Sequence, residues 1–153
     1  MRRLELKIPP VLCFLLMGGL MWLVMRRFPA ADFQLPGQRW LATISVATGL
    51  IIAAAGVVSF RRARTTIDPM KPYTTSALVT SGIFNYTRNP MYLGLILVAL
   101  GWGLWLGNAF ALLGIPTCLA YLTRFQIIPE ERALASLYRE EFRSYCTRVR
   151  RWI

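Results

Sequence analysis

Two short segments of the sequence hold the polar side chains best suited to binding or catalysis, and each lies at the end of a long apolar stretch. The first segment comprises residues 81–94 and the second comprises residues 128–134. Their candidate functional side chains are Arg88, Asn89, Tyr92, Glu130 and Glu131. Ionisable groups beside a membrane core are costly unless they are paired or used, so both segments are candidate parts of a functional site.

The chain contains no histidine, which restricts the chemistry that these segments can perform. Histidine is the commonest general base and the commonest metal ligand. The three cysteines, Cys13, Cys118 and Cys146, form no C-x-x-C motif, and the first two lie inside apolar runs. We therefore expect neither a metal site nor a disulfide framework, and the chemistry must use carboxylates, tyrosine, arginine, asparagine or backbone groups.

The elements that position these residues are expected to be membrane helices. The 153 residues are 56% hydrophobic and their mean hydropathy is +0.46, which is high for a soluble domain. Lys and Arg outnumber Asp and Glu by 18 to 7, and none of these charges falls within residues 89–123. Because the arginines flank apolar spans, they favour a role in membrane orientation over nucleic-acid binding.

Apolar spans predict an all-α polytopic membrane bundle of about four transmembrane helices, forming one domain over residues 1–153. The first two spans are residues 8–25 and 40–60. A cleaved signal peptide is the alternative interpretation of the first span. It is disfavoured because two prolines open the span and an Arg pair follows it, which leaves no clean cleavage site.

The third apolar region, residues 89–123, is too long for one simple span and short for two. Gly107 and Asn108 near its middle predict a tight turn. We therefore expect a helical hairpin of residues 91–106 and 109–125. Its helices are expected to be short, or the hairpin to cross the bilayer incompletely.

The distribution of Lys and Arg predicts which side of the membrane each loop occupies. With four spans, the N-terminus, the second loop (residues 61–88) and the tail after residue 123 share one side and carry fifteen of the eighteen basic residues. The positive-inside rule places that side, with both termini, in the cytosol. The expected location is an integral membrane position, in the inner membrane if the cell is bacterial.

The second loop is long for a connection between packed helices and carries apolar patches at residues 77–79 and 83–84. We expect it to be ordered and to fold over something. The tail, residues 129–153, is predicted to be an amphipathic helix that lies on the membrane surface or packs under the bundle. Its apolar residues recur at helical spacing: Leu134, Leu137, Tyr138, Phe142 and Tyr145.

Three motifs occur in the second half of the chain: R-[HN]-P-x-Y-x-G at residues 88–94, G-x-G at 101–103 and E-E-x-x-L at 130–134. A terminal pattern follows them: Tyr145, Arg148, Val149, Arg151 and Trp152. In this order and spacing, roughly residues 65–153 resemble the isoprenylcysteine carboxyl methyltransferase and phospholipid N-methyltransferase superfamily of integral membrane enzymes. The helices within residues 1–60 show no specific resemblance, as is usual for the variable half of that family.

The resemblance implies an S-adenosylmethionine site at the cytosolic face and methyl transfer to a hydrophobic or lipid-linked acceptor. The family's cofactor contacts fall on Arg88, Asn89, Pro90, Tyr92, Gly101, Gly103, Glu130 and Glu131. The implied catalytic residues are Arg88, Asn89, Tyr92 and Glu131. Many family members have His where this chain has Asn89. Asn cannot take a proton at neutral pH, so a hydrogen-bonding role remains at that position.

The chemistry of the residues agrees with this implication. Arg88 is suited to hold the cofactor's carboxylate as a bidentate pair. Glu130 and Glu131 are suited to pair with its cationic groups or its ribose hydroxyls. Tyr92 lies four residues after Arg88, hence on the same helix face, where it can stack or donate a hydrogen bond.

Each motif taken alone also has a structural interpretation. Glu130 and Glu131 suit the first turn of a helix, and Arg88 suits an anchor at the membrane interface. Gly101 and Gly103 allow close approach of either a ligand edge or a neighbouring helix.

Two other function classes stay open: an NADPH-dependent membrane reductase of the related sterol-reductase type, and a non-catalytic membrane interaction protein. Sterol-reductase chains are generally much longer, with more spans. For a methyltransferase, the candidate acceptors are a prenylated thioether carboxylate, an aminophospholipid head group, and a small hydrophobic thiol or acid. No nucleic acid is expected as a partner.

Overall fold

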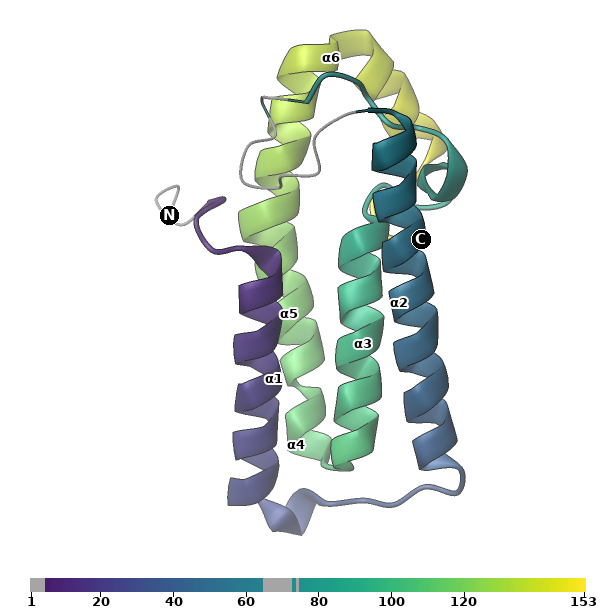
Figure 1. Ribbon diagram of the computed structural model, residues 1–153. Coiled ribbons are helices and arrows are strands. Elements are labelled where there is room, and N and C mark those ends of the chain that lie inside the picture. The colour runs from purple at the N-terminus through teal and green to yellow at the C-terminus, as the bar shows by residue number, and fades with distance from the viewer. Residues whose placement is uncertain (1–4, 65–72, 74) are drawn as a thin grey trace.

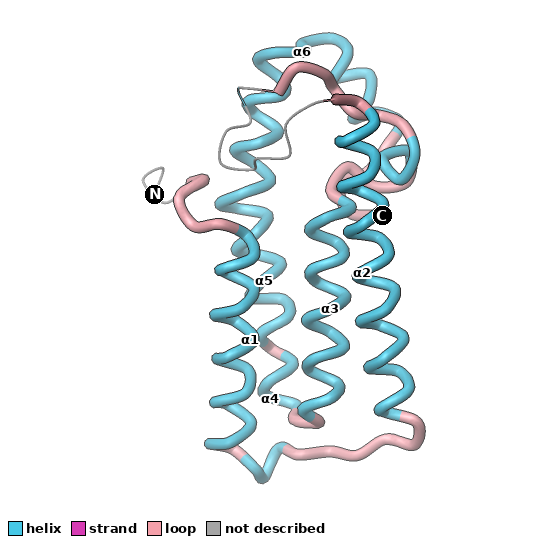
Figure 2. Tube along the Cα trace, viewed as in Figure 1, coloured by secondary structure: helices cyan, strands magenta, loops and turns pink. Residues whose placement is uncertain are grey.

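Helices account for all the regular secondary structure in the part of the chain that the structure, a computed structural model, describes: residues 5–64, 73 and 75–153 (Figure 2). The α-helices are α1 (Pro10–Arg27), α2 (Gln38–Arg62), α3 (Pro90–Leu106), α4 (Ala109–Leu112), α5 (Gly114–Leu122) and α6 (Ile128–Arg148). A π-helical turn, η5 (Thr123–Ile127), joins α5 to α6. The predicted all-α fold is confirmed.

Three helices are long and apolar enough to cross a membrane, judged by length and composition: α1, α2 and the continuous helix that begins at Ala109. The helix α3 is also apolar but has only 17 residues. At about 1.5 Å per residue it spans about 25 Å, less than a bilayer core of about 30 Å. Large apolar side chains such as Leu16 and Ile51 are exposed on the outside of the bundle, where lipid covers them. The chain is an integral membrane protein, and the short hairpin helix agrees with the prediction.

The helices α2 and α3 lie side by side over most of their length (Figure 1). Glycines allow this close approach, because a Cβ added to Gly94 would lie 2.5 Å from the carbonyl oxygen of Gly49 and 2.8 Å from the Cβ of Ala53. In a bilayer, where apolar burial between helices gains little, such close packing is a main source of helix association. This contact fixes α3 against α2, and so fixes where the start of α3 lies.

The turn of the hairpin is held by Asn108 at the end of the bundle where α1 ends and α2 begins (Figure 1). Gly107 takes the left-handed conformation, with φ 64°, that ends α3. Asn108 is fully buried, and its Nδ2 donates to the carbonyl oxygen of Phe28 at 2.8 Å and to Asp32 at 2.7 Å. Its Oδ1 accepts from the Ala111 N–H at 3.0 Å and caps α4. The predicted turn at these two residues is confirmed.

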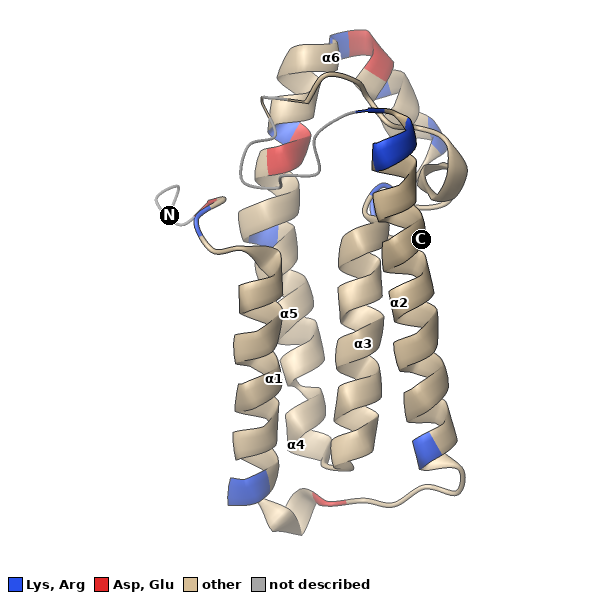
Figure 3. Cartoon of the chain, viewed as in Figure 1, with Lys and Arg blue, Asp and Glu red and all other residues tan. Residues whose placement is uncertain are grey.

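Charged side chains gather toward the two ends of the bundle and leave its middle uncharged (Figure 3). The N-terminal segment, the end of α2, the start of α3 and α6 share one end (Figure 1). At the other end the guanidinium groups of Arg26 and Arg39 lie over the rings of Trp22 and Trp105, with 5.4 Å and 5.7 Å to the ring centroids. Aromatic rings and arginines at this level are typical of a membrane interface. Which end faces the cytosol stays a prediction.

The predicted tail helix differs from the observed one in three ways. The observed helix, α6, begins at Ile128 as a continuation of α5 through η5. It ends at Arg148 instead of continuing to residue 153. It also bends at Arg139, whose φ of 36° and ψ of −108° are not helical. Because of this bend, α6 rises from α5 and curves back over the ends of α2 and α3 (Figure 1).

Candidate active site

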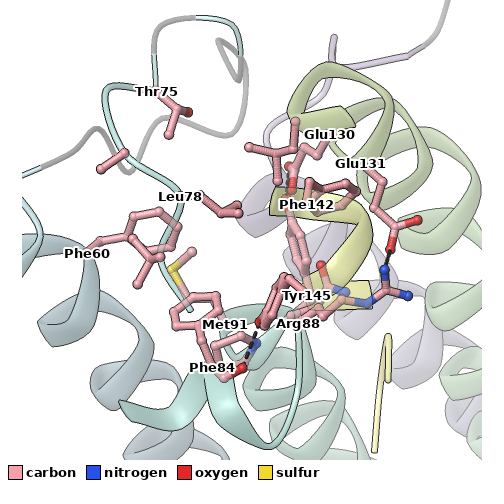
Figure 4. Close-up of a pocket in the computed structure, with 16 residues that line it drawn as sticks. Phe60, Thr75, Leu78, Phe84, Arg88, Met91, Glu130, Glu131, Phe142 and Tyr145 are labelled. Carbon is pink, nitrogen blue, oxygen red and sulfur yellow. Dashed lines mark hydrogen bonds and ion pairs between the residues drawn. The ribbon is translucent and has the colours of Figure 1, made fainter. Parts of the chain in front are cut away.

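A cavity lies where the start of α3 meets the first turn of α6, beneath the loop of residues 75–88 (Figure 4). Its empty space, counted out to its open mouth, is about 820 Å³. Polar and apolar side chains line it: Phe60, Thr75, Ala77, Leu78, Val79, Phe84, Arg88, Asn89, Pro90, Met91, Tyr92, Glu130, Glu131, Leu134, Phe142 and Tyr145. Six of the eight predicted cofactor residues are among them.

The loop covers the cavity because its apolar residues pack on the second half of α6. Val79 and Phe84 are buried in one cluster with Phe142, Tyr145 and Val149. The hydroxyl of Tyr145 also donates to the carbonyl oxygen of Phe84 at 2.7 Å. The prediction of an ordered loop that folds over something is confirmed for residues 75–88, while residues 65–72 and 74 lie outside the described part.

The buried end of the cavity is formed by Tyr92 and Glu130. Tyr92 is 5% exposed, and its hydroxyl donates a hydrogen bond to the carboxyl group of Glu130. Tyr92 lies in the first turn of α3 and Glu130 lies in the first turn of α6, so this bond joins the two predicted segments. Glu130 forms no salt bridge with any described residue.

Arg88 lies beside this pair, with only 15% of its side chain exposed. Its Nη1 is 3.4 Å from a carboxylate oxygen of Glu131 (Figure 4). The same nitrogen also contacts the sulfur of Cys146. The Nε–H of Arg88 is buried and has no hydrogen-bond partner in the described part of the chain. A buried donor without a partner costs free energy, so this N–H is a ready contact for an anionic or polar ligand.

Glu131 is held by an arginine from the end of the chain. Arg151 donates to its two carboxylate oxygens from Nε at 3.1 Å and from Nη2 at 2.6 Å. This fork-to-fork geometry is the strong form of the arginine–carboxylate pair. The bonds to Glu131 raise the pKa of Arg151 above its usual value, against the opposing effect of burial. The Glu131 carboxylate is therefore already neutralised within the protein.

Residues 149–151, here called the C-terminal strap, run back across the start of α3. Arg88 N–H donates to the carbonyl oxygen of Arg150 at 3.1 Å. The side-chain amide of Asn89 donates to the carbonyl oxygen of Arg151 at 2.9 Å, and Thr87 donates to the same oxygen at 3.3 Å. The amide nitrogen of Asn89 is thus used to hold the strap.

Comparison with known proteins places the chain in a family. The family model described as phospholipid methyltransferase matches residues 38–141. The chain belongs to the phospholipid methyltransferase family. An uncharacterized protein of Haemophilus influenzae is also similar, with 46% identity over 63 residues that cover 41% of this chain and all of that protein. A search of solved structures finds no significant match. The chain is therefore a membrane methyltransferase, as the motifs predicted.

Two predicted residues of this methyltransferase, Gly101 and Gly103, do not line the cavity. A Cβ on Gly101 would lie 2.6 Å from Val46 and 2.7 Å from the carbonyl oxygen of Ala42. A Cβ on Gly103 would lie 2.7 Å from Leu112. Both glycines thus serve helix contacts further along α3, about 13 Å or more beyond Tyr92 at 1.5 Å per residue.

Several lining residues of the methyltransferase were not among the sequence predictions. Phe60 at the end of α2 carried no pattern that marks a site. Leu78 and Phe142 belonged to apolar patterns in the loop and the tail, which indicated burial but not what they would surround. The role of Arg151 at Glu131 was also missed, although its place in the terminal pattern was noted. Among the described residues, no cluster of metal-binding side chains occurs.

Proposed function

We propose that the chain transfers a methyl group from S-adenosylmethionine to a hydrophobic or lipid-linked acceptor at the cytosolic face of the membrane. The observation that carries this proposal is the cavity at the start of α3, where Arg88, Tyr92 and Glu130 meet. Membership of the phospholipid methyltransferase family supports it.

The charged groups of the cavity suit both ends of a zwitterionic amino-acid moiety. The buried Nε–H of Arg88 is suited to a carboxylate, since charge-assisted hydrogen bonds are the strong ones. Glu130 has a tyrosine partner but no basic partner among the described residues, so an ammonium or sulfonium group of a ligand is suited to stabilise the ionised form of its buried carboxyl group. The bound cofactor supplies an electrophilic methyl group on its sulfonium.

The rest of the cavity favours transfer by positioning. Methyl transfer is a direct displacement, so its rate depends on alignment of the acceptor and on exclusion of water. Leu78, Phe84 and Phe142 give the cavity an apolar lining beside its charged residues (Figure 4). Asn89 and Glu131 are engaged by the C-terminal strap, so we assign them to holding the site in shape.

The proposed sidedness rests on charge. The cavity lies at the end of the bundle that gathers the second loop and the tail, which carry most of the basic residues. The positive-inside rule assigns that end to the cytosol, where the soluble cofactor is available. The proposed route of the acceptor is from the membrane, because Phe60 at the end of the apolar helix α2 and Met91 at the start of α3 line the cavity.

The test is a calorimetric titration of the detergent-purified protein with S-adenosylhomocysteine. We expect the wild type to bind it and Glu130→Gln to bind at least about tenfold more weakly, since one charge-assisted contact is lost. Glu140→Gln is the matched control, because Glu140 is a fully solvated residue of α6 whose only ion pair, to Arg143, is 3.8 Å long within the described residues.

Absence of S-adenosylhomocysteine binding to wild-type protein that is folded would refute the cofactor assignment. Binding of NADPH in the same assay, without binding of the adenosyl ligand, would favour the reductase alternative. Equal affinity in the wild type and Glu130→Gln would remove Glu130 from the proposed site.

A further inference from the structure

The π-helical turn η5 (Thr123–Ile127), just before Glu130, has a cause in the sequence. Pro129 has no backbone N–H, so it cannot bond to the carbonyl oxygen of Phe125 four residues earlier, and its ring crowds that carbonyl. A π turn widens the helix at this point. The Phe125 carbonyl instead accepts a hydrogen bond from the Leu6 N–H at 3.1 Å. The N-terminal segment thus provides the hydrogen bond that Pro129 cannot donate to the Phe125 carbonyl.

Gln126 provides a second link between the same turn and the N-terminal segment. Its side chain is fully buried, and its Nε2 donates to the carbonyl oxygen of Ile8 at 2.6 Å, whereas its Oε1 has no hydrogen-bond partner among the described residues. Buried amide groups are costly unless they are hydrogen-bonded, so this contact favours one arrangement of the turn. Residues 5–8 are called the N-terminal clamp below.

Glu5 of the clamp binds two arginines on either side of the predicted E-E pair. Its carboxylate lies 2.9 Å from Arg124 in η5 and 2.5 Å from Arg132 in α6. The hydrogen bonds from Arg124 and Arg132 keep the pKa of Glu5 below its usual value, against the opposing effect of desolvation, so Glu5 is ionised at neutral pH. Glu5 therefore bridges the turn to the helix that follows it.

The turn sets the direction of the residues after it. A π turn holds one residue more than an α turn, so it rotates the following helix by about 100° relative to an uninterrupted α-helix. In the observed register Glu130 meets Tyr92, and the fully buried Ile127 packs in the same cluster as Tyr92. A one-residue shift in register would carry Glu130 away from Tyr92 and out of the cavity.

We infer that residues 5–8 are a positioning clamp, in which Glu5 and Leu6 hold the π turn that sets Glu130 and Glu131 in register with α3. The expected effect of the clamp on ligand binding rests on the proposed function. The effect of the clamp on the π turn rests only on the contacts of Glu5 and Leu6 described above. The clamp lies outside residues 38–141, the part of the chain that matches the family model. A segment outside the family core thereby shapes the site.

The test compares Glu5→Gln with Glu140→Gln by hydrogen–deuterium exchange and by S-adenosylhomocysteine calorimetry. Both substitutions remove one carboxylate that pairs with arginine, but the Glu140 pair is 80–87% exposed and lies away from the turn. In Glu5→Gln we expect about five- to tenfold faster exchange in residues 124–134 and a similar loss of ligand affinity. Exchange in α2 and the thermal midpoint should stay unchanged, and Glu5→Asp should restore most of the affinity.

Unchanged exchange in residues 124–134 of Glu5→Gln would overturn the clamp, whatever the ligand result. Faster exchange throughout the chain, or locally faster exchange with full ligand affinity, would show a purely structural contact and would also overturn it. If the wild type binds no S-adenosylhomocysteine, the proposed function fails, and the exchange comparison alone decides whether the clamp exists.

Discussion

The Tyr92 hydroxyl and the Glu130 carboxyl form one direct link between the two segments in which the site residues were predicted, and Arg88 with Glu131 forms another. Those residues could be predicted because polar groups at the ends of apolar spans need a partner or a use. The partners of Asn89 and Glu131 within the protein could not be predicted, because they depend on the path of the C-terminal strap. Gly101 and Gly103 were predicted to contact the cofactor, but in the structure they contact neighbouring helices. A glycine allows either kind of close approach, so the motif alone does not distinguish the two.

At this scale, Tyr92→Phe tests the pair. Loss of the hydroxyl leaves the Glu130 carboxyl without its hydrogen bond, so we expect a loss of about 1–3 kcal/mol in stability. The thermal midpoint of the purified protein measures it. Tyr86→Phe is the control, because Tyr86 is 76% exposed and should tolerate the change. Equal midpoints for the two variants would contradict the importance of the Tyr92–Glu130 bond.

Arg151 permits a second residue-scale prediction. Arg151→Lys keeps the charge but loses the two-pronged contact to Glu131, and Arg151→Gln loses both. Because the Arg151 side chain is 37% exposed, we expect a stability loss of only about 1 kcal/mol for Gln and less for Lys. Thermal unfolding checks the order, with Arg143→Gln on the surface of α6 as the neutral control. A Lys variant less stable than Gln would argue against the ion pair.

Among the elements, the close contact of α2 with α3 determines where the cavity lies. The spans themselves were predictable, because a long apolar run bounded by arginines typically forms a helix that crosses the bilayer. The π turn, the fusion of α5 with α6 and the bend at Arg139 were not. Pro129 in the sequence alone indicated the start of a new helix, since the hydrogen bond from Leu6 that supports a continuous one is a tertiary contact.

Gly94→Ala tests this element-scale contact. The added methyl group would lie within 3 Å of both Gly49 and Ala53, so α3 must move away from α2. We expect a stability loss of about 1–3 kcal/mol, as for other overpacked contacts. Gly19→Ala is the matched control, since no atom lies within 4 Å of its new Cβ. A neutral Gly94→Ala would mean that the two helices are not in close contact in the membrane.

On the scale of the whole molecule, the two ends of the bundle contain different features. One end carries the cavity, the N-terminal clamp and the C-terminal strap. The other end carries the hydrogen bonds of Asn108, which join Phe28 and Asp32, after α1, to the hairpin turn. This division agrees with the uneven distribution of basic residues, which was already visible in the sequence.

Asn108→Ala is expected to separate stability from ligand binding. It removes a helix cap and the hydrogen bond to the Asp32 carboxylate, and it leaves the Phe28 carbonyl with only the Ala31 N–H as donor, at a cost of about 1–3 kcal/mol. Below its lowered thermal midpoint, the variant should bind S-adenosylhomocysteine with wild-type affinity. Asn85→Ala, on the exposed surface, is the control for the midpoint. Weaker binding by folded Asn108→Ala would show that the two ends are coupled.

The short length of α3 has a consequence for the surrounding lipid. The 25 residues of α2 exceed the thickness of a bilayer core, whereas the 17 residues of α3 fall short of it by about 5 Å. A short span thins the bilayer around it, because hydrophobic mismatch costs free energy for each ångström. We therefore expect lipid head groups to lie closer to the start of α3, beside the cavity, than to the ends of the longer α2. A thin membrane brings an acceptor to the site with little displacement, whereas a thick one opposes its approach.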